Sequence, residues 1–377
     1  MKIKFILPAM LAVSIAFTSC KKDNEETAPA DLSKDEGKAL VEATSTRAKQ
    51  DVTDLQESTG GTALDNLTGL LGSSEGENPL GRGYKGKRGK AFRRILGDFK
   101  SSIRATQSKT SEEEAAWDFE GNKGTYTYNN STEDFDLTDS TTDAVVIIFP
   151  AGSDLTVNNA TVTVSEYTED ADGQPTRLDG DLKVDGEVVT SIDYTGAFDG
   201  EGQPTSLELT FVIVPFELKA ELDKQSDTKM SGSSSLTQSG STIYDVAGDI
   251  EFKTAELEDL VSLSGHVQYG DVRVSGSVDG TRMEELDNQE ADPTSEEINS
   301  AFSATITQQS TSAKIGDIIA ADYTDEMDDT YPNLYIRYND GSLELAEDAF
   351  KSVIEDIEEF IEELEADFEE DEVAVRN

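Results

Sequence analysis

Apolar and polar residues alternate along the middle of the chain, from about residue 115 to residue 278, and turn-forming residues recur every ten to fifteen positions there. A period of two with regular turns predicts consecutive antiparallel hairpins. One stretch, Val145–Phe149, is apolar at every position, which predicts a strand that lies centrally or beneath a helix. The sequence therefore predicts an α+β fold that is mainly β, a long antiparallel β-meander to which the N- and C-terminal segments contribute helices.

Two stretches in this region match each other at a spacing of 29 residues. The first reads Gly-Gln-Pro-Thr-Arg-Leu from Gly173, and the second reads Gly-Gln-Pro-Thr-Ser-Leu from Gly202. Each opens an alternating segment after a glycine-rich turn. The match predicts one long hairpin that is duplicated in tandem.

The turn at Val184-Asp185-Gly186 is compatible with two registers, and the register decides which side chains share a face. A two-residue loop would pair charged with apolar residues on both faces. A three-residue loop with Gly186 at a left-handed bulge position separates the two kinds of residue, so we favour it. The pairs that it sets are Leu182 with Val188, Leu178 with Ile192, Lys183 with Glu187, and Arg177 with Asp193.

The same criterion, that apolar residues should share one face, extends the pairing through three further turns. These turns lie at Val214-Pro215, near Asp223–Asp227 and near Gln238–Thr242. The expected pairs are Ile213 with Phe216, Phe211 with Leu218, Leu209 with Ala220, Leu207 with Leu222, Leu222 with Met230, Leu236 with Tyr244, and Met230 with Ile250. One row across the apolar face then falls from large to small residues: Tyr194, Leu209, Ala220, Gly232 and Gly248. Small residues inside a sheet leave room that a helix, sheet curvature or a ligand must fill. A helix from either end of the chain is the favoured occupant, and an apolar ligand on Ala220, Gly232 and Gly248 is the alternative.

The terminal segments show helical periods instead. A weakly apolar face predicts a lightly docked helix from Ser33 to about Glu57, which Gly60-Gly61 ends, and the leucines of residues 64–71 predict a short helix that Gly72 ends. The strongest helical pattern covers about residues 345–370. Its apolar positions recur at three and four: Ala346, Phe350, Val353, Ile357, Phe360, Leu364 and Phe368.

Shorter elements are predicted between the alternating region and the final helix. Residues 283–295 form an acidic connector, and Thr294 with Glu297 has the spacing of a capping box for a short helix. Short strands are predicted around residues 304–308, 315–320 and 334–338. Asn339-Asp340-Gly341 predicts a turn after the last of them.

Charge narrows the range of partners. The chain has 31 Lys and Arg against 78 Asp and Glu, a net charge of −47, which argues against nucleic acid as a partner. One segment, residues 82–109, is basic, with ten Lys or Arg and the single acid Asp98. Docking of this segment on an acidic part of the same chain is favoured over binding of an external anion.

The first twenty residues have a basic start, an apolar run over residues 5–17, and Thr18-Ser19 before Cys20, the only cysteine. Thirteen residues fall short of the roughly 20 apolar residues that span a bilayer as a helix, so we interpret this stretch as a secretory signal. Small residues directly before a cysteine resemble the lipobox of bacterial lipoproteins, although Phe17 stands where that family usually has Leu. The resemblance implies that the Cys20 sulfur receives a diacylglyceryl group, that the leader is cut before Cys20, and that the new amine is acylated.

Two or more acyl chains anchor a protein stably, whereas a single chain binds a membrane only marginally. The resemblance implies an outer-membrane destination, because Lys21 is not the Asp that retains such proteins in the inner membrane. Periplasmic and cell-surface orientations both stay open. If Cys20 carries lipid, the chain forms no intrachain disulfide.

Chemistry-bearing motifs are few. The sequence has no glycine-rich phosphate loop and no His/Cys cluster, and its only histidine, His266, is expected to face outward with Ser264 and Gln268. Two acidic stretches, Asp170–Gly173 and Asp325–Asp329, have carboxylates that suit loose calcium binding but lack EF-hand spacing. We therefore expect no enzyme activity and no cofactor.

These patterns predict five regions: a signal peptide (1–19), a lipidated Cys20 with a flexible tether (20–36), a helical region with the basic segment (37–110), the β-meander (111–282), and an acidic connector with short strands and the final helix (283–377). The expected function is that of a non-catalytic, membrane-anchored lipoprotein, a binding or structural module of the cell envelope. The alternative is a carrier or sensor of an apolar or lipid ligand on the sheet. The lipid bilayer is the one partner that the sequence indicates, and it does not identify a protein or glycan partner.

Overall fold

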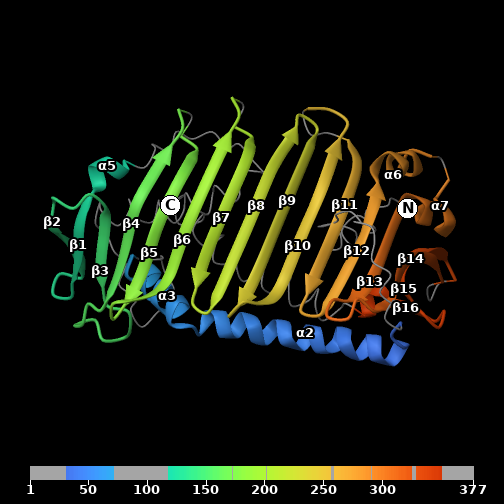
Figure 1. Ribbon diagram of the computed structural model, residues 1–377, viewed down its shortest axis with the longest axis horizontal. Helices are drawn as coiled ribbons and strands as arrows, with labels where there is room; N and C mark the ends of the chain where they lie inside the picture. Colours follow the sequence, from blue (N-terminus) through green and yellow to red (C-terminus); the bar gives the residue numbers. More distant parts are fainter. Residues whose placement is uncertain are drawn as a thin grey trace. The chain divides into compact units, whose positions relative to one another are not determined.

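The alternating segments form strands, and the fold is α+β and mainly β: a long, mostly antiparallel sheet of sixteen strands with a few helices (Figure 1). This computed structural model describes residues 31–71, 118–171, 173–200, 202–255, 259–289, 291–324 and 328–349. The leader with Cys20, the basic segment 82–109 and the chain from residue 350 onward lie outside the described residues. The described chain falls into two compact units, which we call the first unit (31–52 and 220–349) and the second unit (53–219).

The second unit contains the parallel pair of the sheet. Its elements are α3 (Thr59–Leu71), α5 (Phe119–Asn122), β1 (Gly124–Asn129), β2 (Asp134–Asp139), β3 (Val145–Phe149), β4 (Ala160–Glu169), β5 (Pro175–Val184), β6 (Glu187–Phe198) and β7 (Pro204–Ile213). The strand order is β7-β6-β5-β4-β3-β1-β2, with β1 and β3 parallel. As predicted, the apolar stretch Val145–Phe149 lies inside the sheet, and Phe149 is fully buried. Leu67 of α3 belongs to the same core cluster as Phe149.

The register of the β5–β6 hairpin differs from the prediction. Asp185 and Gly186 form a two-residue loop, and both have positive φ, 52° and 89°. Lys183 therefore pairs with Val188, and one extra residue, Val189, then shifts the register. Without a bulge, a two-residue loop would pair charged with apolar residues on both faces. The bulge removes this conflict, because beyond it Gly180 faces Ile192 and Leu178 faces Tyr194. The predicted pairs of Leu182, Leu178, Lys183 and Arg177 are all wrong.

The bulge lies where α3 meets the sheet. A Cβ on Gly60 would come within 2.7 Å of both the Thr190 hydroxyl and the Val189 carbonyl oxygen. Gly60 thus allows the first turn of α3 to approach the strand closely. The prediction that Gly60-Gly61 ends a helix is wrong, since both glycines lie inside α3.

The two matching stretches form matching turns. Asp170 and Asp199 each donate their backbone N–H to the carbonyl oxygen four residues on, and each accepts the N–H of that residue on its carboxylate, at 2.9 Å in all four bonds. Gly173 and Gly202 take similar positive φ angles, 80° and 77°. β5 and β7 both begin at the proline that follows. The duplicated turn predicted from the sequence is therefore confirmed.

The first unit carries the remaining strands. Its elements are most of α2 (Lys34–Gln56), β8 (Phe216–Ser226, divided between the units), β9 (Lys229–Gln238), β10 (Ser241–Phe252), β11 (Leu260–Tyr269), β12 (Val272–Asp279), α6 (Gly280–Asp287), α7 (Ser295–Ala301), β13 (Phe302–Gln308), β14 (Lys314–Thr324), β15 (Thr330–Tyr338) and β16 (Leu343–Leu345). Strands β9 to β16 follow one another in the sheet in sequence order.

The predicted pairs Leu236–Tyr244 and Met230–Ile250 are both present. The turns at Val214-Pro215 and before Lys229 are also present, but the predicted registers across β8 stay predictions.

Helix α2 begins and ends within one residue of the predicted bounds and lies across strand ends in the first unit (Figure 1). Its buried face includes Gly37, Val41 and Thr44. Val41 packs in a core cluster with Ile306, Ile315 and Ile336. Before the helix, the Leu32 N–H donates to the Lys314 carbonyl oxygen at 2.9 Å, which fixes the chain to the start of β14.

The segment after β12 contains more structure than predicted. Residues 283–287 of the expected acidic connector belong to α6, which begins at Gly280 and which Asp279 caps by accepting the Arg282 N–H. The predicted capping box is present at α7, where Thr294 and Glu297 each accept the other's backbone N–H. The three short strands are longer than predicted, the turn at Asn339–Gly341 is confirmed, and β16 was not predicted. Leu345 belongs to β16, and residues 346–349 are helical, so the final helix begins one residue after the predicted start.

Candidate functional site

The small-residue row is the first candidate site. Gly232 pairs directly with Gly248, as predicted, and in the second unit Tyr194 pairs with Leu209. The row continues past the predicted residues: Gly248 pairs with Gly265, and Gly265 with Gly276. Gly276 in turn faces Ala304 of β13. The strands β9 to β12 thus carry glycine at four paired positions.

The physical reason for glycine differs from one position of this row to another. A Cβ on Gly276 would overlap the carbonyl oxygen of Ser303 on the next strand, and Gly265 has φ 149°, which L side chains rarely adopt. The backbone therefore requires glycine at these two positions. A Cβ on Gly232 would meet only the Glu221 carbonyl oxygen, at 3.6 Å, an ordinary contact. Backbone geometry thus leaves Gly232 free to carry a side chain.

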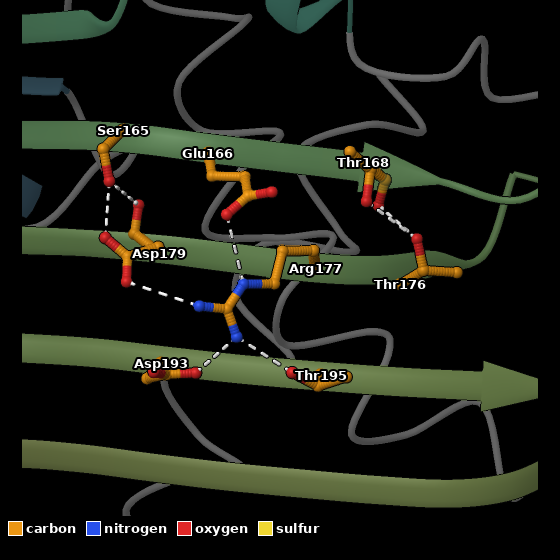
Figure 2. A network of polar contacts seen from close by, with 8 residues as sticks. All are labelled: Ser165, Glu166, Thr168, Thr176, Arg177, Asp179, Asp193 and Thr195. Carbon is orange, nitrogen blue, oxygen red and sulfur yellow. Dashed lines mark hydrogen bonds and ion pairs between the residues drawn. The ribbon is translucent and has the colours of Figure 1, made fainter.

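Arg177 is the centre of a polar network on β4, β5 and β6 of the second unit (Figure 2). Its guanidinium contacts three carboxylates: Asp193 at 2.6 Å, Glu166 at 3.3 Å and Asp179 at 3.7 Å. The hydrogen bond to Asp193 raises the pKa of Arg177, burial opposes this rise, and the bond to Glu166 adds to it. The Ser165 hydroxyl donates to Asp179 at 2.5 Å. The Arg177 guanidinium thus neutralises and orients the carboxylates around it.

His266 lies in a second cluster, on β10, β11 and β12 of the first unit. Its Nε2 is 2.6 Å from Oδ2 of Asp245, and Nη2 of Arg273 donates to the same oxygen at 3.0 Å. Arg273 also donates to Gln268, whose side chain is buried and donates to the Gly270 carbonyl oxygen. His266 shares a face with Ser264 and Gln268, as expected, but its side chain is only 15% exposed and is hydrogen-bonded to Asp245.

Three tyrosines gather on one face of the β14–β15 hairpin. Tyr323 pairs directly with Tyr331, and their ring centroids lie 5.5 Å apart with the planes tilted by 59°. Tyr335 lies four residues along β15 from Tyr331, on the same face, and Asn333 lies between them. Burial raises the pKa of Tyr335, and the neighbouring Tyr323 and Tyr331 raise it further.

The acidic turns offer no assembled metal site within the part of the chain that the structure describes. No group of three or more His, Cys, Asp or Glu side chains there is placed to hold a metal ion. Asp170 uses one carboxylate oxygen to accept the Gln174 N–H and close its own turn. Asp172 and residues 325–327 lie outside the described residues, so calcium binding at these stretches stays a hypothesis.

Sequence reasoning missed the networks of Arg177, Asp245 and the tyrosines. The signal for the Asp245 network was the alternation of β10 and β11, because pairing Tyr244 with Tyr269 sets Asp245 opposite Gln268, next to His266 on the same face. The signal for the tyrosine face was the alternation of Tyr331, Asn333 and Tyr335. The network of Arg177 depends on the bulge, for which the sequence has no strong signal.

Comparisons with known proteins identify no relative: no family model, curated protein or solved structure matches the chain. Among the described residues, no helix has the length and apolar character needed to cross a membrane.

Proposed function

We propose that the protein is a non-catalytic lipoprotein of the outer membrane, anchored through acylated Cys20, that serves as a binding or structural module of the cell envelope. The anchor is supported by the small residues before a unique cysteine at the end of an apolar leader. The net charge of −47 supports a strongly hydrated protein that does not bind anionic surfaces broadly.

The observation that carries the non-catalytic part is the pairing of polar side chains within the sheet. Arg177 bridges three carboxylates, and His266 and Arg273 share Asp245. Catalytic groups need a reacting atom within reach and a pKa matched to the task. Side chains that neutralise one another across neighbouring strands instead stabilise the sheet and keep its face polar.

Replacement of the cysteine tests the anchor. Cys20→Ser is expected to abolish incorporation of labelled palmitate and to release the protein from the membrane fraction or leave its leader uncut. Ser19→Ala, which keeps a small residue before the cysteine, is the matched control and is expected to incorporate label like the parent. Incorporation that persists in Cys20→Ser contradicts the proposal. Protease treatment of whole cells separately decides between cell-surface and periplasmic orientation.

The alternative function is that of a carrier or sensor of an apolar or lipid ligand on Ala220, Gly232 and Gly248. The specific observation that favours it is the open space at Gly232, where an added Cβ would meet only the Glu221 carbonyl oxygen, at 3.6 Å. Gly232 is the position where a side chain fits the backbone, so Gly232→Leu fills the row without straining the strand.

Native mass spectrometry of the protein purified without its lipid tests this alternative. A carrier retains an added mass that Gly232→Leu reduces. Ser231→Leu, on the opposite face of the same strand, leaves the added mass unchanged. A parent protein that carries no added mass after purification counts against the carrier function.

A further inference from the structure

The small-residue row continues across the sheet to the cluster on which the last described residues lie. Direct pairing extends it beyond β12 by one residue on each of β13, β14 and β15: Ala304, Ile318 and Ile336. These three residues belong to the core cluster against which Ala346 and Ala349 pack. The C-terminal segment therefore leaves the described chain at the large-residue end of the row.

The other end of the row, on β9 and β10, has little described cover. Met230, Val246 and Ile250 share the face of Gly232 and Gly248, are half-buried and belong to neither core cluster. Among the described helices, α6 lies against β11 and β12 and α7 against β13 and β14, and none lies comparably against β9 or β10. An apolar face that is lined by glycines leaves space that other apolar side chains can fill.

The apolar positions of the C-terminal segment have sizes that suit this row. The segment begins with Ala346, beside the isoleucines of the row, and its later positions are larger, where the row carries alanine and glycine. Large side chains over small ones fill the space between two packed elements without overlap. Each strand from β15 to β9 gives the row one residue, and the segment has one apolar position for each strand: Ala346, Phe350, Val353, Ile357, Phe360, Leu364 and Phe368.

The length of the segment also matches the length of the row. From Ile336 on β15 to Gly232 on β9 the row crosses successive strands that lie about 4.8 Å apart, roughly 29 Å in all. A helix from Ala346 to Phe368 rises roughly 33 Å, and its apolar positions recur about every 5.5 Å. A helix that crosses the strands at a slant therefore places one apolar position over each strand.

The basic segment 82–109 is a poorer candidate for this row. It lies in the chain between α3 and α5, and Leu67 of α3 and Phe119 of α5 both belong to the core cluster of the second unit. The C-terminal segment instead continues from residues that already pack at the row. Its first turn is also fixed by charge, because Glu344 accepts a hydrogen bond from Lys38 of α2 at 2.6 Å.

We propose that residues 350–368 form a helix that lies along the small-residue row, with Phe360 over Gly265 of β11 and Phe368 over Gly232 of β9. The glycines of the row make room for the large side chains of this helix, and its acidic flanks face solvent. An apolar ligand has no room on the row while the helix lies there. The inference thus goes beyond the proposed function and competes with the carrier alternative.

Disulfide formation in the full-length protein tests the position of the helix. Cys20→Ser removes the native thiol, and Gly232→Cys with Phe368→Cys introduces two thiols that face each other if the proposal is right. The backbone accepts a side chain at Gly232. Two cysteines form a disulfide only when their Cβ atoms approach to about 4.5 Å or less. Brief oxidation with copper phenanthroline and oxygen is expected to link them within one chain, as peptide mapping by mass spectrometry detects.

Two further pairs of cysteines are the controls. Ser231→Cys with Phe368→Cys places the first thiol on the opposite face of the same strand, and it is expected to form the disulfide about tenfold more slowly or less. Gly232→Cys with Phe360→Cys is also expected to react slowly, because the proposal sets these positions two strands, roughly 10 Å, apart. Thermal unfolding checks the folding of each variant.

Equal rates for Gly232→Cys and Ser231→Cys overturn the proposal, and so does the absence of an intrachain disulfide from Gly232→Cys to either Phe368→Cys or Leu364→Cys. A disulfide between two chains would assign the row to a second copy. A retained apolar mass without any disulfide would assign it to a ligand, and both results contradict the proposal. Because residue 20 carries no acyl group in this background, the outcome is independent of the proposed anchor.

Discussion

At the scale of single residues, Arg177 compensates for a register that is otherwise unfavourable. The bulge at Val189 sets Asp179 directly opposite Asp193, and like charges at facing positions destabilise an antiparallel pair. Although the backbone partner of Arg177 is Thr195, its long side chain reaches both carboxylates. One guanidinium thus makes the bulged register acceptable.

Replacing Arg177 with Met should expose this repulsion. We expect Arg177→Met to lower the free energy of unfolding by about 1 kcal/mol, because it removes the ion pairs and leaves the facing carboxylates uncompensated. The loss should shrink in 1 M salt, where the Debye length falls to about 3 Å. Urea unfolding at low and high salt measures both effects.

Lys183→Met is the matched control, since Lys183 lies on the same strand and pairs with Asp181 at 3.4 Å. It should change stability by less than about 0.5 kcal/mol. If Arg177→Met and Lys183→Met behave alike at both salt concentrations, the compensating role of Arg177 is wrong.

The same residues show how far pairing could be predicted from the sequence. Leu236–Tyr244, Met230–Ile250 and Gly232–Gly248 followed from strict alternation, because only one register keeps the apolar residues on one face. The β5–β6 register did not follow. Its bulge accompanies the close approach of Gly60 on α3, a contact between segments more than 120 residues apart that no local pattern contains.

At the scale of elements, the β13–β15 region is held by a charged group that the sequence does not single out. Asp317 receives hydrogen bonds from Lys314 and Arg337, at 2.9 and 3.1 Å, across two strands. Burial raises the pKa of Asp317, but these bonds outweigh burial, so that the pKa lies below its ordinary value. The ionised carboxylate therefore stabilises the folded state.

The sign of the shift gives a pH dependence. Because the folded pKa is the lower one, the stabilisation is present above the unfolded value, about pH 4, and is lost as pH falls through the folded pKa. We expect Asp317→Asn to be about 1 kcal/mol less stable than the parent at pH 7, and the difference to shrink below pH 4. Urea unfolding from pH 2.5 to pH 7 measures the difference.

Asp292→Asn serves as the control, because Asp292 is exposed in the segment between α6 and α7. Its stability should follow that of the parent at every pH. A constant difference between Asp317→Asn and the parent over the whole range would mean that the amide disturbs packing and that the charge contributes nothing.

Elements themselves were predicted well where their boundaries depend on local chemistry. α2 and the capping box at α7 follow from helix-forming composition and from Thr294 with Glu297. β16 escaped prediction because three residues are too few for a period to appear, and its strand state depends on the pairing of Leu343 and Leu345 with β15. The tyrosine face escaped prediction because it requires two strands in register.

At the scale of the whole molecule, the distribution of charge limits how the C-terminal segment associates. Residues 344–372 carry fifteen acids and the single base Lys351, whereas residues 82–109 carry ten bases and one acid. A parallel homodimer through the apolar positions of the final helix would bring the acidic flanks together, which is unfavourable. Association of this segment within its own chain is therefore the expectation.

The described start of the C-terminal segment is consistent with that expectation. Ala346 and Ala349 pack against the core cluster of α2, β13, β14 and β15. Just before them, Glu344 accepts hydrogen bonds from Lys38 of α2 at 2.6 Å and from the Tyr338 hydroxyl at 2.7 Å. Burial raises the pKa of Glu344, but the hydrogen bonds from Lys38 and Tyr338 outweigh burial. The pKa of Glu344 therefore lies below its ordinary value.

Two truncations separate β16 from the residues that follow it. Ending the chain after Asn339 removes β16, Glu344 and both alanines, and it should lower the melting temperature by roughly 5 °C or more and increase hydrogen exchange in β13–β15. Ending it after Ala349 keeps those contacts and removes residues 350–377, which contain the other apolar positions of the predicted helix together with most of its acids. If these positions are buried against the sheet, the second truncation also lowers the melting temperature, because apolar burial supplies most of the docking energy. If the chain that ends after Ala349 has the same melting temperature as the full-length protein, the final helix is a free appendage, available to an external partner.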